Sequence, residues 1–272
     1  MSNPIALIGR GATYLVLSLA AFVSVFPFFW MLVGATNTNA DIIRGKSSLG
    51  EALWRNIEVF FASADMPRVF FNSFFIAGLG TALTLLVSSL AGYGFEIFRS
   101  RFKERIFAVM LLMLSVPFAA LMIPLFMLMA NLKLMNSYQA VILPAVASIF
   151  IIFYFRQATK AFPHELRDAA RIDGLKEWQI FLFVYMPVMR STYAAATIIV
   201  FMTHWNNYLW PLIVLQTNDM KTLPLVVATL SQGYSPDFGV VMIGSIVTTL
   251  PTLIIFFLLQ RRFVEGMLGA VK

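Results

Sequence analysis

Six long apolar runs constrain the fold of this chain more than any other feature of its sequence. A helix of about 20 residues crosses the ~30 Å hydrocarbon core of a bilayer, whereas a membrane β-strand alternates apolar and polar residues. The runs here are continuous, and apolar side chains make up 60% of the 272 residues. We therefore predict an all-α integral membrane protein with six transmembrane helices. The predicted spans are Gly11–Thr36, Val69–Phe95, Arg105–Met129, Tyr138–Thr159, Pro187–Leu212 and Phe238–Gln260.

The basic residues are distributed unevenly between the two sides of this predicted bundle. The net charge is +7, and 14 of the 20 Lys and Arg residues fall at the termini and in the loops after the second and fourth spans. Loops rich in Lys and Arg remain in the cytoplasm, so we expect a multi-pass protein with both termini there. Membrane insertion accounts for the basic charge, and no nucleic acid partner is expected. The first run exceeds the ~7–15 residues of a signal-peptide core, which favours a retained span over cleavage near Ala35 or Ala40.

The sequence lacks the residue patterns of an enzyme or of an ion-coupled carrier. It has no cysteine, and His164 and His204 have no partners at metal-ligand spacing, so no metal site is predicted. Gly45-Lys46-Ser47 resembles the end of a phosphate-binding loop, but Ala40 replaces its first glycine. Ion-coupled carriers commonly place an ionisable residue inside a span, but no Asp or Glu lies deep inside a predicted span here. A sodium ion held by backbone carbonyls alone would not be detected in this way. We therefore expect no catalytic residue and no ATP site in this chain. Transport is then either passive, as in a channel, or driven by energy that another subunit supplies.

One charged segment, between the fourth and fifth spans, has the pattern of a short cytoplasmic helix. Pro163 suits the first helical position, Glu165 places negative charge in the first turn, and Gly174 suits the left-handed residue beyond the end. The apolar residues from Leu175 to Pro187 predict a second helix at the membrane interface.

This charged segment has two interpretations. The small residues Ala169 and Ala170 would let the helix lie deep in a groove of a partner protein. An ordinary hairpin, stabilised by pairs of Arg167 and Arg171 with Asp168, is the alternative, and physical reasoning by itself favours the hairpin.

The order of residues in this segment resembles a known motif. Glu165–Gly174, followed by Phe181 and Pro187, resembles the EAA loop of ABC-importer permeases. The resemblance extends to Asn72-Ser73, to Trp205–Pro211 and to the tail from Gln260 to Lys272, and so covers essentially the whole chain. The chain thus resembles the binding-protein-dependent permease family, and within it the smaller permease of the maltose-type carbohydrate uptake branch.

The resemblance implies a type I ABC importer permease fold with a cytoplasmic coupling helix. The coupling residues would be Glu165, Ala169, Ala170, Asp173 and Gly174, with Glu165 making the charged contact to an ATPase subunit and Gly174 permitting a sharp turn. The two alanines come later than in the usual motif, since Leu166 and Arg167 directly follow Glu165. The tail residues Gly269, Ala270, Val271 and Lys272 would also contact the ATPase.

The resemblance further implies a complex in the bacterial inner membrane. Its partners would be a second homologous permease, two cytoplasmic ATPase subunits and an extracytoplasmic solute-binding protein. ATP and Mg²⁺ would bind to the ATPase, and this chain would hold no cofactor. The implied function is a permease subunit of an ATP-driven oligosaccharide or disaccharide importer with alternating access. The alternatives are a glycerol-phosphate or polyol importer, a passive facilitator and a secondary carrier.

Residues on the fifth span are the candidates for contact with a sugar. Asn206, Asn207, Tyr208 and Trp210 offer hydrogen bonds and a stacking face, although an aromatic belt and helix packing are the favoured alternative. The outer loop 216–237 resembles one that reaches into the binding protein, and much of the sugar contact can lie in the other permease. We divide the chain into a first span with its outer loop (1–68), a core of five spans with the EAA loop at 160–187 (69–260), and a cytoplasmic tail (261–272).

Overall fold

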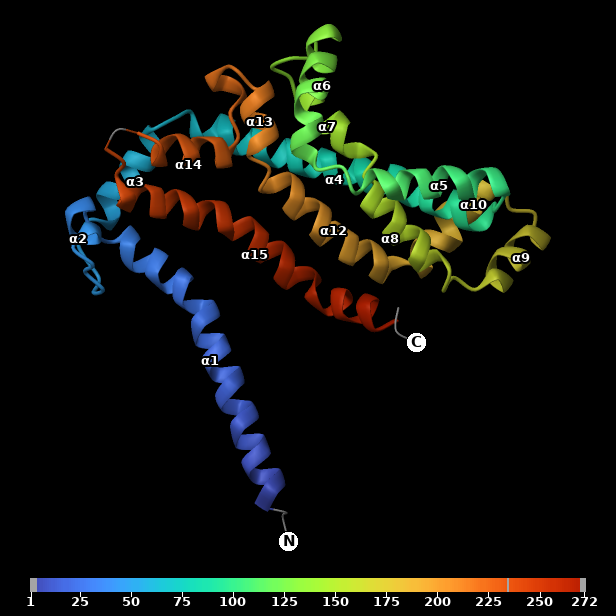
Figure 1. Cartoon of the computed structure of the whole chain (residues 1–272), viewed down its shortest axis with the longest axis horizontal. Helices are drawn as coiled ribbons and strands as arrows, with labels where there is room; N and C mark the ends of the chain where they lie inside the picture. Colours follow the sequence, from blue (N-terminus) through green and yellow to red (C-terminus); the bar gives the residue numbers. More distant parts are fainter. Residues whose placement is uncertain (1–3, 234, 270–272) are drawn as a thin grey trace. The chain divides into compact units, whose positions relative to one another are not determined.

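The computed structural model describes residues 4–233 and 235–269 and the side chains of residues 11–233 and 235–261. These residues form helices and no strand, which confirms the all-α fold (Figure 1). The chain forms two compact units. One comprises Met1–Met66 with Val226–Thr249, and the other comprises Pro67–Leu225 with Leu250–Lys272. The functional division at residues 68 and 260 stays a prediction.

The first unit is held together by amide side chains at the end of its long first helix. Its elements are α1 (Pro4–Ala35), α2 (Asn39–Ile43), α3 (Leu53–Ala62), the end of α14 (Leu223–Ser231) and the first part of α15 (Phe238–Gly269). Asn56 donates hydrogen bonds to the carbonyl oxygens of Ala35 and Asn37, both at 2.9 Å. Arg55 forms an ion pair with Asp237 at 2.8 Å. Between residues 11 and 35, α1 is apolar and largely exposed within this unit, as expected for a lipid-facing helix.

The second unit is built around α4, with the charged segment at one end (Figure 1). Its helices are α4 (Met66–Ile97), α5 (Arg101–Met113), α6 (Phe118–Asn131), α7 (Tyr138–Val146), α8 (Ile149–Thr159), α9 (His164–Ile172), α10 (Glu177–Ile180), α11 (Met186–Val188), α12 (Arg190–Trp205) and α13 (Leu209–Val214). A π-helix, Phe181–Tyr185, joins α10 to α11, and a 3-10 turn, Asn218–Met220, precedes α14. The predicted second helix is therefore present as one continuous run, Glu177–Val188, with a π-helical segment in its middle.

Three of the six predicted spans are continuous helices, and three are bent. The continuous ones are Gly11–Ala35, Met66–Ile97 and Phe238–Arg261. The bent pairs are Arg101–Met113 with Phe118–Asn131 (105°), Tyr138–Val146 with Ile149–Thr159 (41°), and Glu177–Val188 with Arg190–Val214 (82°). Counting each pair as one span gives the six predicted from the sequence, but the sequence analysis did not predict the breaks.

Pro144 shows how a neighbouring helix supports one of these bent spans. Because proline has no amide hydrogen, Pro144 leaves the carbonyl of Ala140, four residues earlier, without its helical donor. The indole nitrogen of Trp210 donates to that carbonyl at 2.8 Å. In hydrocarbon a freed backbone group needs such a partner. A neighbouring helix thus satisfies the freed carbonyl, and this bond gives Trp210 a structural role.

The backbones of α4 and α8 approach closely at Gly92. A Cβ atom at this position would lie 2.7 Å from the Cβ of Phe155 and 2.8 Å from the amide nitrogen of Arg156. At Gly94, on the same helix, a Cβ atom would meet nothing within 4 Å. We therefore expect Gly92→Ala to push α4 and α8 apart and to lower the free energy of unfolding by about 1–3 kcal/mol.

Thermal unfolding of the purified protein in detergent measures this effect, with Gly94→Ala as the control. The control should unfold like the unchanged protein. Equal unfolding temperatures for the two variants would show that the close approach at Gly92 does not constrain the packing.

Candidate functional site

The charged segment forms α9, a helix of nine residues. Gly174 follows its end with φ of +85°, a left-handed conformation that glycine adopts without steric cost. The helix and its end are therefore confirmed. Pro163 is the extended residue before the first turn, so its predicted place inside the helix is wrong by one position.

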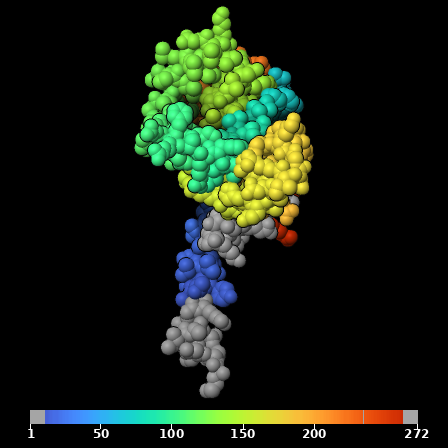
Figure 2. All heavy atoms as spheres, turned by 90° about the vertical axis from the view of Figure 1, so that its right-hand side faces the viewer, coloured from blue at the N-terminus to red at the C-terminus, as the bar shows by residue number. Residues whose placement is uncertain are grey.

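The two faces of α9 have different surroundings. Ala170 is buried, and the side chain of Arg167 is only 12% exposed, so this face packs inward. The opposite face is open to solvent (Figure 2), and Ile172 is 87% exposed. The exposed residues of the segment are His164, Glu165, Leu166, Asp168, Ala169, Arg171, Ile172 and Asp173, and among them Arg171 pairs with Glu177. This outer face combines three carboxylates with two exposed apolar side chains, a pattern that suits a basic, partly apolar partner surface.

Glu177 connects α9 to the end of α4. It forms ion pairs with Arg167 at 3.2 Å and with Arg171 at 2.6 Å, and it accepts a hydrogen bond from the hydroxyl of Tyr93 at 3.3 Å. The guanidinium of Arg167 also lies 5.2 Å from the ring centre of Phe98. Several contacts therefore hold α9 to α4 through one carboxylate.

The expected pairing of Arg167 and Arg171 with Asp168 is wrong. Both arginines pair with Glu177 instead, Arg167 from a mostly buried position and Arg171 from an exposed one, which leaves Asp168 on the exposed face. Sequence analysis missed Glu177 because it lies beyond the turn at Gly174. The only local signal was an acidic residue at the start of the following short helix.

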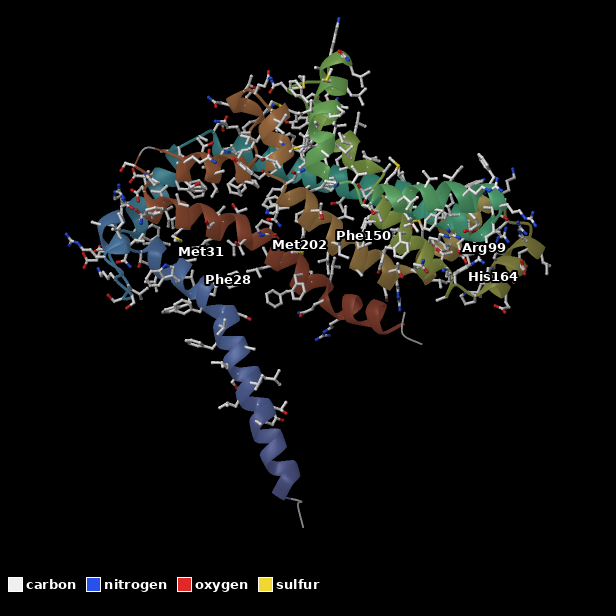
Figure 3. The ribbon with its side chains drawn as sticks, in the orientation of Figure 1. Phe28, Met31, Arg99, Phe150, His164 and Met202 are labelled. Atoms are coloured by element: carbon white, nitrogen blue, oxygen red, sulfur yellow. The ribbon has the colours of Figure 1, made fainter. Side chains whose placement is uncertain are left out.

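A buried ion cluster lies in the same unit and joins α4, α5 and α8. The side chains of Glu96 and Arg156 are 2% and 7% exposed, and their nearest charged atoms are 3.4 Å apart. Arg156 also pairs with Glu104, and Glu96 also pairs with Arg99. The Arg156 guanidinium stacks over the ring of Phe107 at 4.0 Å. Figure 3 shows Arg99 and His164 at the same end of the unit.

This cluster contains a buried carboxylate close to the end of a span. Glu96 lies one residue beyond the predicted end of its span, yet α4 continues through it and its side chain is buried. Because Arg156 neutralises Glu96, the cluster is a cross-link between helices and gives no support to ion coupling. The two residues are 60 positions apart, so their pairing was not visible in the sequence.

A cavity of about 550 Å³ lies in the second unit at two of the helix breaks. Leu114 and Phe118 flank the break between α5 and α6, and Ala147 and Ser148 form the break between α7 and α8. Both breaks fall near the middle of their predicted spans, which is the depth predicted for the bilayer midplane. The described residues that line it include no Asp, Glu, Lys or Arg. The cavity is thus uncharged and mostly apolar, with a few polar groups, as is usual for small-molecule sites.

The four predicted sugar-contact residues separate into two pairs. Asn207 and Trp210 line the cavity, although the Trp210 indole nitrogen is already bonded to Ala140. Asn206 is exposed and donates to the carbonyl of Met202 at 3.0 Å, and Tyr208 packs against an apolar cluster of the same unit. Neither Asn206 nor Tyr208 lines the cavity.

Two further polar residues of the cavity were not predicted. His204 is only 5% exposed, and its Nε2 atom lies 3.3 Å from the Thr84 hydroxyl oxygen. His204 therefore lies inside the protein and faces the cavity. Thr84, from α4, was not predicted to line a cavity, because its neighbours in the sequence form no motif that indicates a binding site.

Asn72 and Ser73, part of the resemblance, hold the outer segment before α14. The Asn72 side chain donates to the carbonyl oxygens of Asp219 and Lys221 at 2.8 and 2.9 Å. The Ser73 hydroxyl oxygen accepts a hydrogen bond from the amide of Leu223 at 2.7 Å. These bonds fix the start of the loop predicted to reach toward a binding protein.

The predicted tail contacts stay a prediction. The helix α15 ends at Gly269, and Ala270, Val271 and Lys272 lie outside the described residues. Within the part of the chain that the structure describes, no cluster of three or more potential metal ligands occurs.

Comparisons with known proteins relate the whole chain to transport systems. Residues 85–269 match the model of the family described as binding-protein-dependent transport system inner membrane component. The chain is 68% identical over 259 residues to the lactose transport system permease protein LacG of Rhizobium radiobacter, with 95% of each chain covered. It is 38% identical to the arabinooligosaccharides transport system permease protein AraQ of Halalkalibacterium halodurans, with 93% of this chain and 92% of AraQ covered.

A solved structure shares the fold. It is the crystal structure of a bacterial ABC transporter involved in the import of the acidic polysaccharide alginate. One of its chains superposes with a TM-score of 0.79 and 19% sequence identity, covering 97% of this chain and 99% of that chain. This similarity confirms the predicted permease fold.

Proposed function

Because the chain belongs to the family of binding-protein-dependent transport system inner membrane components, we propose that it is the permease subunit of an ATP-driven importer for a disaccharide or oligosaccharide. Relatives at 68% and 38% identity are named for lactose and arabinooligosaccharides. The uncharged cavity near the predicted bilayer midplane is the observation that carries the proposal.

A neutral sugar suits this cavity better than glycerol phosphate. A phosphate group in a low-dielectric site needs basic side chains to offset its desolvation. The described lining contains no Lys or Arg, whereas it does contain the hydroxyl and amide groups that bind sugar hydroxyls. A glycerol-phosphate substrate is thus disfavoured for this subunit.

The coupling to ATP hydrolysis runs through α9 in this proposal. The outer face of α9, with Glu165 among its carboxylates, binds a cytoplasmic ATPase subunit that holds ATP and Mg²⁺. Glu177 transmits the movement of α9 to α4. Ala170 packs inward and supports the helix, while Ala169 and Asp173 lie on the binding side.

The proposed complex follows from the family. It contains a second homologous permease, two ATPase subunits and an extracytoplasmic solute-binding protein in the inner membrane. Both termini and α9 face the cytoplasm in this arrangement, in agreement with the 14 of 20 basic residues assigned to that side.

The test is lactose transport by the complex purified with the ATPase and binding protein of the same gene neighbourhood, in lipid vesicles. We expect lactose-loaded binding protein to stimulate ATP hydrolysis several-fold and lactose to accumulate only when ATP is present. Lactose entry without any ATPase subunit would instead identify a passive facilitator. ATP-driven transport of glycerol phosphate but not lactose would contradict the sugar assignment.

A further inference from the structure

The cavity is bordered by backbone that is not helical, near the middle of a predicted span. Between α7 and α8, Ala147 has φ of −94° and ψ of 57°, outside the helical range. Irregular backbone at this depth is tolerated where it is covered by protein or lines a cavity that holds water or a ligand. The break therefore marks a place where polar atoms face the cavity, and Ala147 and Ser148 both line it.

Two polar side chains at the cavity have no hydrogen-bond partner among the side chains and backbone that the structure describes. Ser148 precedes the first turn of α8, but its hydroxyl makes no capping hydrogen bond. Among the described residues, neither this hydroxyl nor the side-chain amide of Asn207 has a hydrogen-bond partner, and both residues line the cavity. Other serines before helices here, such as Ser100 and Ser137, do accept a capping bond. The hydroxyl of Ser148 and the amide of Asn207 are thus available to a ligand.

The remaining lining indicates what that ligand is. Phe118 and Phe150 come from different helices and add aromatic rings to the lining, and such rings can pack against the C–H face of a sugar ring. Figure 3 shows Phe150 on α8, away from the end that carries Arg99 and His164. The lining has no charge to hold an ion, and a volume of about 550 Å³ lies in the usual range for small-molecule sites.

We propose that this subunit has its own sugar subsite in the cavity, in which Ser148 and Asn207 bind hydroxyl groups of one sugar ring during transport. The inference rests on the proposed function and extends it, because it assigns direct sugar recognition to this permease as well as to any site in the second permease. The break between α7 and α8 presents Ser148, and α12 and its following turn present Asn207.

Lactose uptake by the complete complex in vesicles tests the subsite. Loss of one hydrogen bond to a sugar weakens binding by about 3- to 10-fold, so we expect Ser148→Ala and Asn207→Ala each to lower lactose uptake by about this factor. Asn206→Ala is the matched control for Asn207, because Asn206 lies next to it but outside the cavity. Thr197→Val serves as a second control on α12 and should leave uptake unchanged, as should Asn206→Ala.

A labelling experiment detects the sugar at the site itself. The chain has no cysteine, so Ser148→Cys and Asn206→Cys each introduce a single thiol. During ATP-driven turnover, lactose should slow the reaction of a small water-soluble thiol reagent with Ser148→Cys but not with Asn206→Cys.

The outcomes separate the subsite from the proposed function. If the unchanged complex transports lactose, but Ser148→Ala and Asn207→Ala behave like Asn206→Ala and lactose gives no protection, the subsite is overturned and the function stands. Such a result would assign the cavity to lipid or to a side chain of the second permease. If the unchanged complex transports no sugar, both proposals fail together.

Discussion

The Ile172→Lys variant is expected to fold and insert normally but to lose at least about 99% of its ATP-driven lactose uptake. Ile172 is 87% exposed and is the last residue of α9, so a lysine there disturbs no core packing and suits the negative end of the helix. In the proposed complex this side chain is buried against the ATPase. A buried, unpaired ammonium costs several kcal/mol, which is enough for a loss of about 100-fold or more in binding.

Ile43→Lys is the matched control for this prediction. Ile43 is also an exposed isoleucine at the last position of a helix, α2, but it lies in the segment predicted to face outside. Uptake and co-purification of the ATPase should both fall for Ile172→Lys and remain normal for Ile43→Lys. Normal uptake by Ile172→Lys would remove α9 as the coupling element, even if the protein proved to be an importer.

Replacement of Arg156 by methionine should be the most destabilising of the substitutions considered. Removing one partner of a buried ion pair typically costs about 3–5 kcal/mol, because the other charge is left buried without compensation. Glu96 would keep only Arg99, which is itself 58% exposed. The stacking of Arg156 over Phe107 would be lost as well. The three helices α4, α5 and α8 would then lose their shared cross-link.

Unfolding temperatures in detergent measure this effect, with Arg99→Met as the control. Arg99 also pairs with Glu96, but from an exposed position, so its loss should cost less than about 1 kcal/mol. The double variant Glu96→Gln/Arg156→Met should recover part of the lost stability, since it removes both buried charges. Equal stabilities for Arg156→Met and Arg99→Met would contradict the assignment of a buried cross-link.

The charged segment shows how far local patterns reach. The end of α9 was predicted correctly and its start to within one residue, because capping depends on residues within one helical turn, and Gly174 has the predicted left-handed backbone. The direction of its arginines was not predictable. Asp168 and Glu177 are both near in the sequence, and only the packing of α9 against α4 decides that Arg167 and Arg171 pair with Glu177.

The candidate sugar residues show the same limit. Asn206 and Asn207 are indistinguishable by composition and adjacent in the chain, yet only Asn207 lines the cavity. The difference arises where α12 ends, since the Asn206 side chain bonds back to Met202 in the helix while Asn207 follows it. Nothing in the sequence around Ser148 indicated that it would line a cavity, because this depends on the break between α7 and α8.

Sequence alone established an all-α membrane protein with six spans, the short charged helix and the resemblance to a permease family. These properties depend on the length of apolar runs and on residues within a turn of each other, so they can be read along the chain. Tertiary structure decided the pairing of Glu96 with Arg156, the capture of the Ala140 carbonyl by Trp210 and the cavity at the broken spans. The first two join groups 60 and 70 positions apart, because a buried charge or freed carbonyl takes whichever partner the folded helices bring near it.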